Sequence, residues 1–165
     1  MKLPLFLKDL HYDELRGDDP RSKGEYRFQL FGDVVIKIKG LGSKPPASFR
    51  DRDGLEWACV SGSCLIIRKG YAWNGATPKK WLLGRWWGTP DFRKTHLATL
   101  VHDVCFQFLR TAHFPLDVRQ CNSVFLSIMV AQKFRLANVY HGAVTDFGKL
   151  FTGEYPKKGE YSTLL

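Results

Sequence analysis

Hydrophobic and polar residues follow a different pattern in each half of the chain. In residues 25–40, two isoleucines alternate with two lysines at positions 36–39, as in a half-buried strand, and a Gly-Asp pair provides a turn signal. Two further β-type runs, residues 57–60 and 64–68, flank a Ser-Gly-Ser turn and predict a hairpin. Residues 41–53 are polar and contain two prolines, so we expect a loop there. The first half is therefore predicted to be β-rich.

Apolar residues recur at helical spacing in the second half. Residues 96–110 carry leucine, valine and phenylalanine at this spacing, and residues 117–135 do the same after an Asp-x-x-Gln sequence that resembles a capping box. A shorter pattern covers residues 137–150, and Thr-Pro-Asp at 89–91 is a plausible helix start. We therefore predict an α+β fold, in which an N-terminal antiparallel sheet with hairpins precedes a C-terminal three-helix bundle.

Length and composition favour a single domain. The chain has 165 residues, of which 44% are hydrophobic, so it is long enough to bury a substantial core. We divide it into a β-rich part (1–78), a tryptophan-rich basic loop (79–94), a helical part (95–151) and a flexible tail (152–165). No apolar run approaches the length of a membrane span, and the first residues lack the apolar core of a secretory signal. We expect a soluble protein made in the cytoplasm, with its four cysteines as free thiols.

The formal net charge of +9 favours an anionic partner. A phospholipid surface or an acidic protein fits this charge, and a nucleic acid is a weaker alternative. The candidate binding residues in the basic loop are Lys79, Lys80, Trp81, Arg85, Trp86 and Trp87. Tryptophan beside basic residues suits a membrane interface, a protein interface or stacking on a single-stranded nucleic acid. Alternatively, these tryptophans cover the junction between the sheet and the helices.

The pair His102-Asp103 interrupts an apolar helical run. Charged groups inside a core cost several kcal/mol unless they are paired or bound to a metal, so this pair is a candidate site. Asn122 on the next predicted helix points toward the core, and antiparallel packing of the two helices brings it against His102. The same packing brings Cys121 against Cys105. In the functional interpretation, the side-chain carbonyl of Asn122 orients an imidazole that takes a proton from water. In the structural interpretation, the two side chains form a satisfied polar bridge that sets the helix register.

Several segments resemble a phage family named domain of unknown function 1353. They are residues 70–78 (GYAWNGATP), 88–91 (GTPD), 100–106 (LVHDVCF) and 121–129 (CNSVFLSIM), in the order that this family shows. The resemblance covers roughly residues 25–150. It implies a bacteriophage or prophage gene product, in the host cytoplasm or in the virion, with no established activity.

A more distant resemblance concerns chemistry. Residues 102–106 (HDVCF) are similar to the His-Asp-x-Cys-Tyr helix of phospholipase A(2) enzymes, and Cys121-Asn122 is similar to the Cys-Asp of their facing helix. The resemblance implies His102 as general base, Asn122 as orienting residue and Asp103 as a calcium ligand, with carbonyls from residues 70–77. It also places Asn74 at the metal site.

This chain departs from both patterns because Asn74 and Asn122 stand where the phage family has aspartate. Both changes remove negative charge from the proposed site. An asparagine can orient a histidine, but it does not stabilise the imidazolium form. We therefore weigh a calcium-dependent ester or lipid hydrolase, or its degenerate relative, against a non-catalytic phage interaction protein. The latter would be a tail or baseplate component, or an inhibitor of a host defence system, with the tryptophan-rich loop as its working surface.

Overall fold

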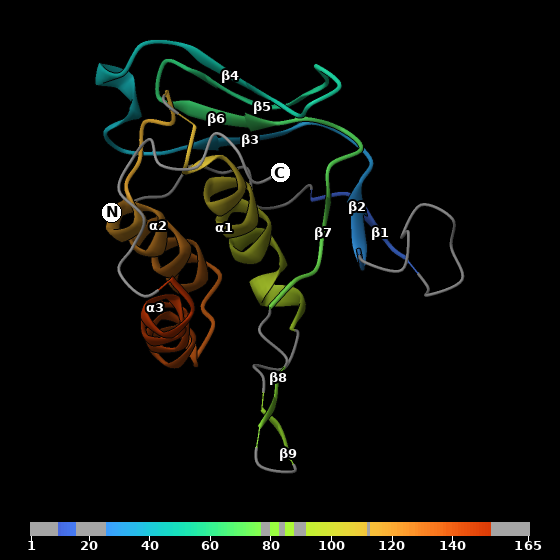
Figure 1. Ribbon diagram of the computed structural model, residues 1–165, viewed down its shortest axis with the longest axis vertical. Helices are drawn as coiled ribbons and strands as arrows, with labels where there is room; N and C mark the ends of the chain where they lie inside the picture. The colour runs from blue at the N-terminus through green and yellow to red at the C-terminus, as the bar shows by residue number, and fades with distance from the viewer. Residues whose placement is uncertain are drawn as a thin grey trace.

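The computed structural model describes residues 10–15, 26–76, 80–82, 85–87, 92–111 and 113–152, and for 80–82, 85–87 and 146–152 the description covers the backbone. It has the expected α+β architecture, with antiparallel sheets in the N-terminal part and three helices in the C-terminal part (Figure 1). The elements that build the core are two sheets of three and four strands, a central helix and two further helices.

The four-stranded sheet has the order β3-β6-β5-β4 and is antiparallel throughout. Its strands are β3 (Val34–Lys37), β4 (Ala47–Arg50), β5 (Glu56–Ser61) and β6 (Cys64–Ile67). The predicted alternation is confirmed, since Ile36 and Ile38 are buried, whereas Lys37 and Lys39, which alternate with them, are exposed. The hairpin predicted around the Ser-Gly-Ser turn is also confirmed as β5 and β6. The inward face of the four-stranded sheet packs on the helices, and there the ring of Phe49 in β4 contacts the ring of Phe108 in the helix that begins at His96.

One prediction for this region is wrong. Residues 41–53, predicted as a loop, contain a short 3-10 helix η2 (Leu41–Ser43) and the strand β4, which forms because it pairs with β5. Within residues 25–40, the turn separates β3 from β2 (Phe28–Leu30), which joins a separate three-stranded sheet of order β1-β2-β7. The other strands of that sheet are β1 (Tyr12–Glu14) and β7 (Ala72–Trp73).

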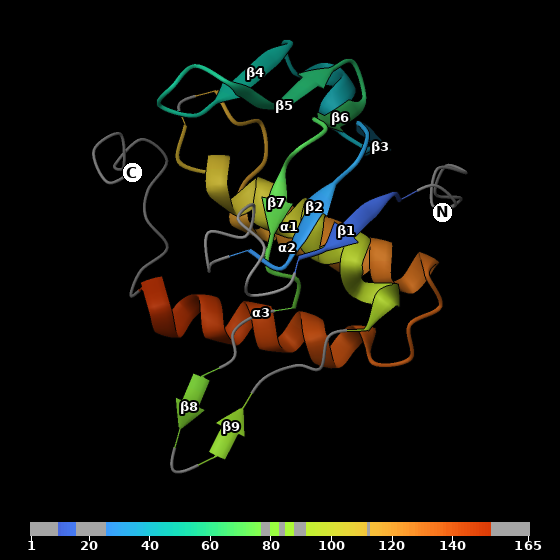
Figure 2. The same cartoon turned by 90° about the vertical axis from the view of Figure 1, so that its right-hand side faces the viewer.

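The helix α1 (His96–Phe108) lies at the centre of the molecule (Figures 1 and 2). It follows a short 3-10 helix η3 (Arg93–Thr95), and nine of its thirteen residues are buried, so it is surrounded on most sides. The helix start expected at 89–91 lies outside the described residues. On one side of α1 the ring of His96 contacts Phe28 of β2, and on another α1 packs against α2.

The helix α2 (Val118–Ala131) begins with the predicted capping box. The side chain of Asp117 accepts a hydrogen bond from the Gln120 backbone amide at 2.8 Å, and the Gln120 side chain accepts one from the Asp117 amide at 2.9 Å. The helix ends at Ala131, four residues before the expected end at residue 135. Two residues after this end, Lys133 adopts a left-handed backbone conformation with φ 53°. The third helix, α3 (Ala137–Thr152), packs against α2, and its Tyr140 is buried.

The tryptophan-rich segment contains two short strands instead of an irregular loop. The strands β8 (Lys80–Leu82) and β9 (Arg85–Trp87) pair antiparallel, with the Cα atoms of Trp81 and Trp86 opposite each other. This hairpin projects away from the helices and from the four-stranded sheet (Figures 1 and 2).

Candidate functional site

The predicted contact between His102 and Asn122 is present at the interface of α1 and α2. The Nε2 atom of His102 lies 3.1 Å from the Oδ1 atom of Asn122. Asn122 is buried, and His102 is partly exposed. The imidazole stacks on Phe106 one turn further along α1, with ring centroids 4.2 Å apart, and also contacts Phe125 of α2 at 5.0 Å. The two helices therefore hold the ring between two phenyl rings and one amide.

This hydrogen bond determines where the imidazole carries its proton. The amide oxygen of Asn122 can only accept, so Nε2 of His102 donates and Nδ1 keeps its lone pair. Enclosure by the two helices lowers the pKa of His102 to about 4, because burial disfavours the charged ring, and the contact with Asn122 offsets this only in part. At neutral pH His102 is therefore a neutral and weakly basic imidazole.

The cysteines of the two helices lie together, as expected. Cys105 and Cys121 are buried free thiols in hydrogen-bond contact, which together with burial raises the pKa of Cys105 well above its usual value. Cys59 and Cys64 are free as well. A buried thiol with a raised pKa is a poor nucleophile, so this pair fills the core between α1 and α2.

Asp103 follows His102 but lies toward a different neighbour. Its charge raises the pKa of the Tyr71 phenol, for which burial is the larger cause, so Asp103 lies close to the segment that leads into β7. Tyr71 is buried and donates its hydroxyl proton to Gln107 at 2.7 Å.

The donors at the implied calcium site are few. No group of three or more His, Cys, Asp or Glu side chains within metal-binding range occurs in the described part of the chain. Asn74, in the turn after β7, is partly exposed and contributes an amide instead of a carboxylate. Calcium prefers six to eight oxygen ligands, several of them carboxylates, so these residues suit the ion poorly.

A cavity of about 330 Å³ adjoins the same segment, and the sequence did not indicate it. Its lining consists of Tyr26, Gln29, Asp51, Trp57, Gly70, Tyr71, Ala72 and Gln107. The Asp51 carboxylate accepts hydrogen bonds from the Trp57 indole at 2.7 Å and from two backbone amides, and these contacts hold its pKa below the usual range. Asp51 lies in the stretch that was expected to be a loop, where no periodicity marks a pocket residue. His102 and Asn122 do not line this cavity.

His96 of α1 and the candidate binding residues of the basic loop take no part in the His102–Asn122 contact. His96 is buried and its Nδ1 atom lies 2.6 Å from the Tyr12 hydroxyl, which gives it a partner in the three-stranded sheet. Of the six candidate binding residues, five lie in the β8–β9 hairpin, namely Lys80, Trp81, Arg85, Trp86 and Trp87. Lys79 lies outside the described residues.

Comparison with known proteins supplies no relative. No family model, no curated protein and no solved structure matches the chain. In the described part of the chain, no helix is both long and apolar enough to cross a membrane. Fold and site geometry are therefore the basis for assigning a function.

Proposed function

We propose that this is a phage or prophage interaction protein that acts by binding an anionic partner, and that its His102–Asn122 pair is the remnant of a phospholipase-like helix pair. The observation that carries the proposal is the partner of His102. A buried amide, and not a carboxylate, holds the imidazole, and the pKa of that imidazole is about 4.

The chemistry of proton transfer supports this proposal. A general base works best when its pKa lies near the working pH, and a pKa of about 4 makes His102 a weak proton acceptor at neutral pH. A carboxylate partner would stabilise the imidazolium that forms during catalysis, whereas an asparagine does not. Replacing the triad aspartate by asparagine in a serine protease lowers kcat by about 10⁴-fold. The same deficiency applies here.

The β8–β9 hairpin is the proposed working surface. It combines three tryptophans with Lys80 and Arg85 within two short strands, and the whole chain has a formal net charge of +9. Trp and Arg are enriched among the residues that dominate binding energies at protein interfaces. A projecting hairpin of this composition supports attachment to an acidic protein or to anionic headgroups.

Co-sedimentation with lipid vesicles tests this proposal. The full chain should bind phosphatidylglycerol vesicles more tightly than phosphatidylcholine vesicles at low salt, and raised salt should weaken the binding. The variant Trp86→Ala/Trp87→Ala should lose most of this binding, while Phe92→Ala, an exposed aromatic outside the hairpin, should keep it. Equal binding by the hairpin variant and the Phe92→Ala control would contradict the proposed surface.

A calcium-dependent ester hydrolase is the second candidate. The favouring observation is that the contact with Asn122 fixes the ring and leaves Nδ1 of His102 with a lone pair, as a base requires. This candidate also needs calcium, for which Asp103 would be the carboxylate ligand among donors that suit the ion poorly. Hydrolysis that depends on His102 would distinguish this candidate from the binding protein.

A further inference from the structure

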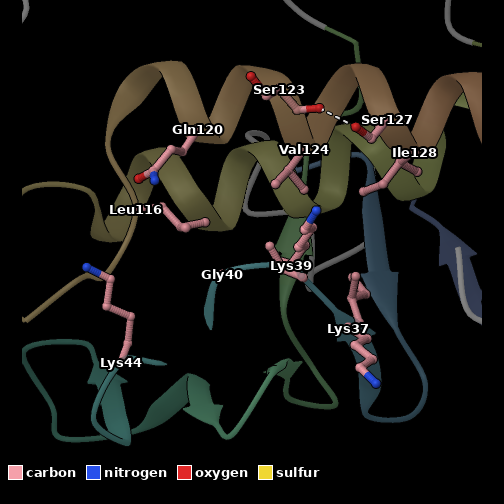
Figure 3. A pocket seen from close by; sticks show the side chains of 12 residues that line it. Lys37, Lys39, Gly40, Lys44, Leu116, Gln120, Ser123, Val124, Ser127 and Ile128 are labelled. Carbon is pink, nitrogen blue, oxygen red and sulfur yellow. Dashed lines mark hydrogen bonds between the residues drawn. The ribbon is translucent and has the colours of Figure 1, made fainter. Parts of the chain in front are cut away.

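A groove of about 210 Å³ runs between β3 and α2 (Figure 3). One wall is β3 with the turn that follows it, and the other wall is α2 with the residues just before it. Its lining consists of Ile36, Lys37, Ile38, Lys39, Gly40, Lys44, Leu116, Gln120, Ser123, Val124, Ser127 and Ile128. The floor is thus aliphatic and the rim carries three lysines.

The strand β3 is an edge of the four-stranded sheet, since β6 is its neighbour on one side only. The backbone N–H of Ile38 donates a hydrogen bond to the carbonyl oxygen of Ser63. The backbone N–H and C=O groups of the alternating residues 34, 36 and 38 therefore point toward β6. The backbone groups of Val35 and Lys37 then face the open edge. Neither residue donates a backbone hydrogen bond across that edge in the described part of the chain. Such an edge is a template for an added strand.

Among the described residues, no acid forms an ion pair with a lysine of the groove. The described ion pairs involve arginines, and none of Lys37, Lys39 and Lys44 forms one with a described acid. Lys39 and Lys44 extend toward α2, while Lys37 points away from it (Figure 3). Asp117, the N-cap residue of α2, is engaged in the capping box. In the part of the chain that the structure describes, no ion pair compensates the positive charge on either side of β3.

The helical wall adds apolar contacts and acceptor atoms. The hydroxyls of Ser123 and Ser127 donate to backbone carbonyls one turn earlier on α2, at 2.8 and 2.7 Å, so their oxygens can only accept. Val124 and Ile128 lie between and beside them (Figure 3). The Gln120 side chain uses its oxygen for the capping box, and its amide protons remain available to a ligand carboxylate.

We propose that the groove binds an extended acidic segment of another protein, which adds a strand to the open edge of β3. An added strand points successive side chains to opposite faces of a sheet, so acids on one face meet Lys37, while apolar residues flanked by acids on the other face enter the groove between Lys39 and Lys44. A second copy of this chain fits less well, because each copy carries a formal net charge of +9, whereas an acidic segment complements the lysines. This inference rests on the proposal that the protein acts by binding, but it concerns a surface separate from the hairpin.

Fluorescence anisotropy with defined peptides tests the groove. The probe is the fluorescein-labelled heptapeptide Glu-Glu-Val-Glu-Val-Glu-Glu, in which the two valines share one face of the strand with the first and last glutamates. The full chain should bind it, and the variant Lys39→Glu/Lys44→Glu should bind at least tenfold more weakly. The control Arg93→Glu/Lys94→Glu makes the same change in net charge at exposed residues outside the groove and should bind like the unmodified protein.

Backbone pairing has its own readout. Methylating the valine amides of the peptide should abolish binding, and bound peptide should protect the amide protons of Val35 and Lys37 from hydrogen exchange. The inference would be overturned if the protein bound the methylated and unmethylated peptides with equal affinity, or if the two charge variants bound the peptide equally. It would also be overturned if the groove bound phosphatidylglycerol vesicles but not the peptide. The Trp86→Ala/Trp87→Ala variant should bind the peptide normally, so failure of the hairpin proposal is distinguishable from failure of this one.

Discussion

The neighbours of a histidine that is packed between two helices determine whether the neutral or the charged imidazole is favoured. For His102 that state is neutral, because Phe106, Phe125 and the Asn122 amide surround the ring and none of them carries a charge. The polar bridge satisfies the buried amide of Asn122, which would otherwise cost about 1–3 kcal/mol. At the scale of the residue, a structural role in setting the register of α1 on α2 is therefore enough to account for the buried His102–Asn122 pair.

The low pKa of His102 predicts a specific dependence of stability on pH. The pKa is about 4 in the folded protein and 6.5 as an ordinary value, so the unfolded chain binds more protons between these limits. The contribution of His102 to the free energy of unfolding should therefore be complete above about pH 6.5 and should be lost as the pH drops toward about 4. Urea denaturation at intervals across this range measures it.

The variant His102→Gln is the matched control, because glutamine retains a polar side chain without titrating. Its free energy of unfolding should change less across the same range than that of the unmodified protein. The carboxyls of Asp33, Asp51 and Glu56 have lowered pKa values, so their contributions are lost only at lower pH. Identical slopes for both proteins would show that His102 is not desolvated.

The His102–Asn122 contact could be predicted from the sequence because helical spacing and a short connection determine which faces meet. The same argument placed Cys121 against Cys105. The contacts of Asp51 could not be predicted, since they depend on a turn that brings its carboxylate to the Trp57 indole. Local patterns contain no information about such long-range or turn-dependent partners.

Among the elements, the start of α2 is the one whose sequence signal is strongest. Asp117 and Gln120 satisfy two backbone amides that the helix leaves without partners. Asp117→Ala should lower the free energy of unfolding by about 0.5–2 kcal/mol, measured by urea denaturation. Asp117→Asn keeps an acceptor oxygen and should lose much less. An equal loss in both variants would show that the capping hydrogen bond is not the cause.

The sequence predicts elements that are long enough to show a periodic pattern of hydrophobic and polar residues. It does not predict short strands that form only because they pair with another strand. The β5–β6 hairpin has alternation and a turn signal, and it is present. The strand β4 covers only four residues after two prolines, too few to show a period, and pairing with β5 makes it a strand. The same holds for the β8–β9 hairpin, whose three-residue strands stand in a segment dominated by tryptophan and basic residues.

At the scale of the whole molecule, positive charge and two surfaces support a binding role. The β8–β9 hairpin projects from one end, and the groove beside β3 lies toward the four-stranded sheet at the other end (Figures 1 and 2). Both surfaces carry basic residues, and the formal net charge of +9 favours anionic partners at each. Neither surface includes His102 or Asn122.

The central claim is that binding, and not proton transfer by His102, is the function of this fold. The most direct test measures ester hydrolysis on phosphatidylglycerol vesicles with calcium, for the unmodified protein and for His102→Ala, with folding of the variant verified by circular dichroism. We predict no difference between the two rates, because a neutral histidine with a pKa of about 4 and an amide partner is a poor base. A calcium-dependent rate that the folded His102→Ala variant loses would contradict this account.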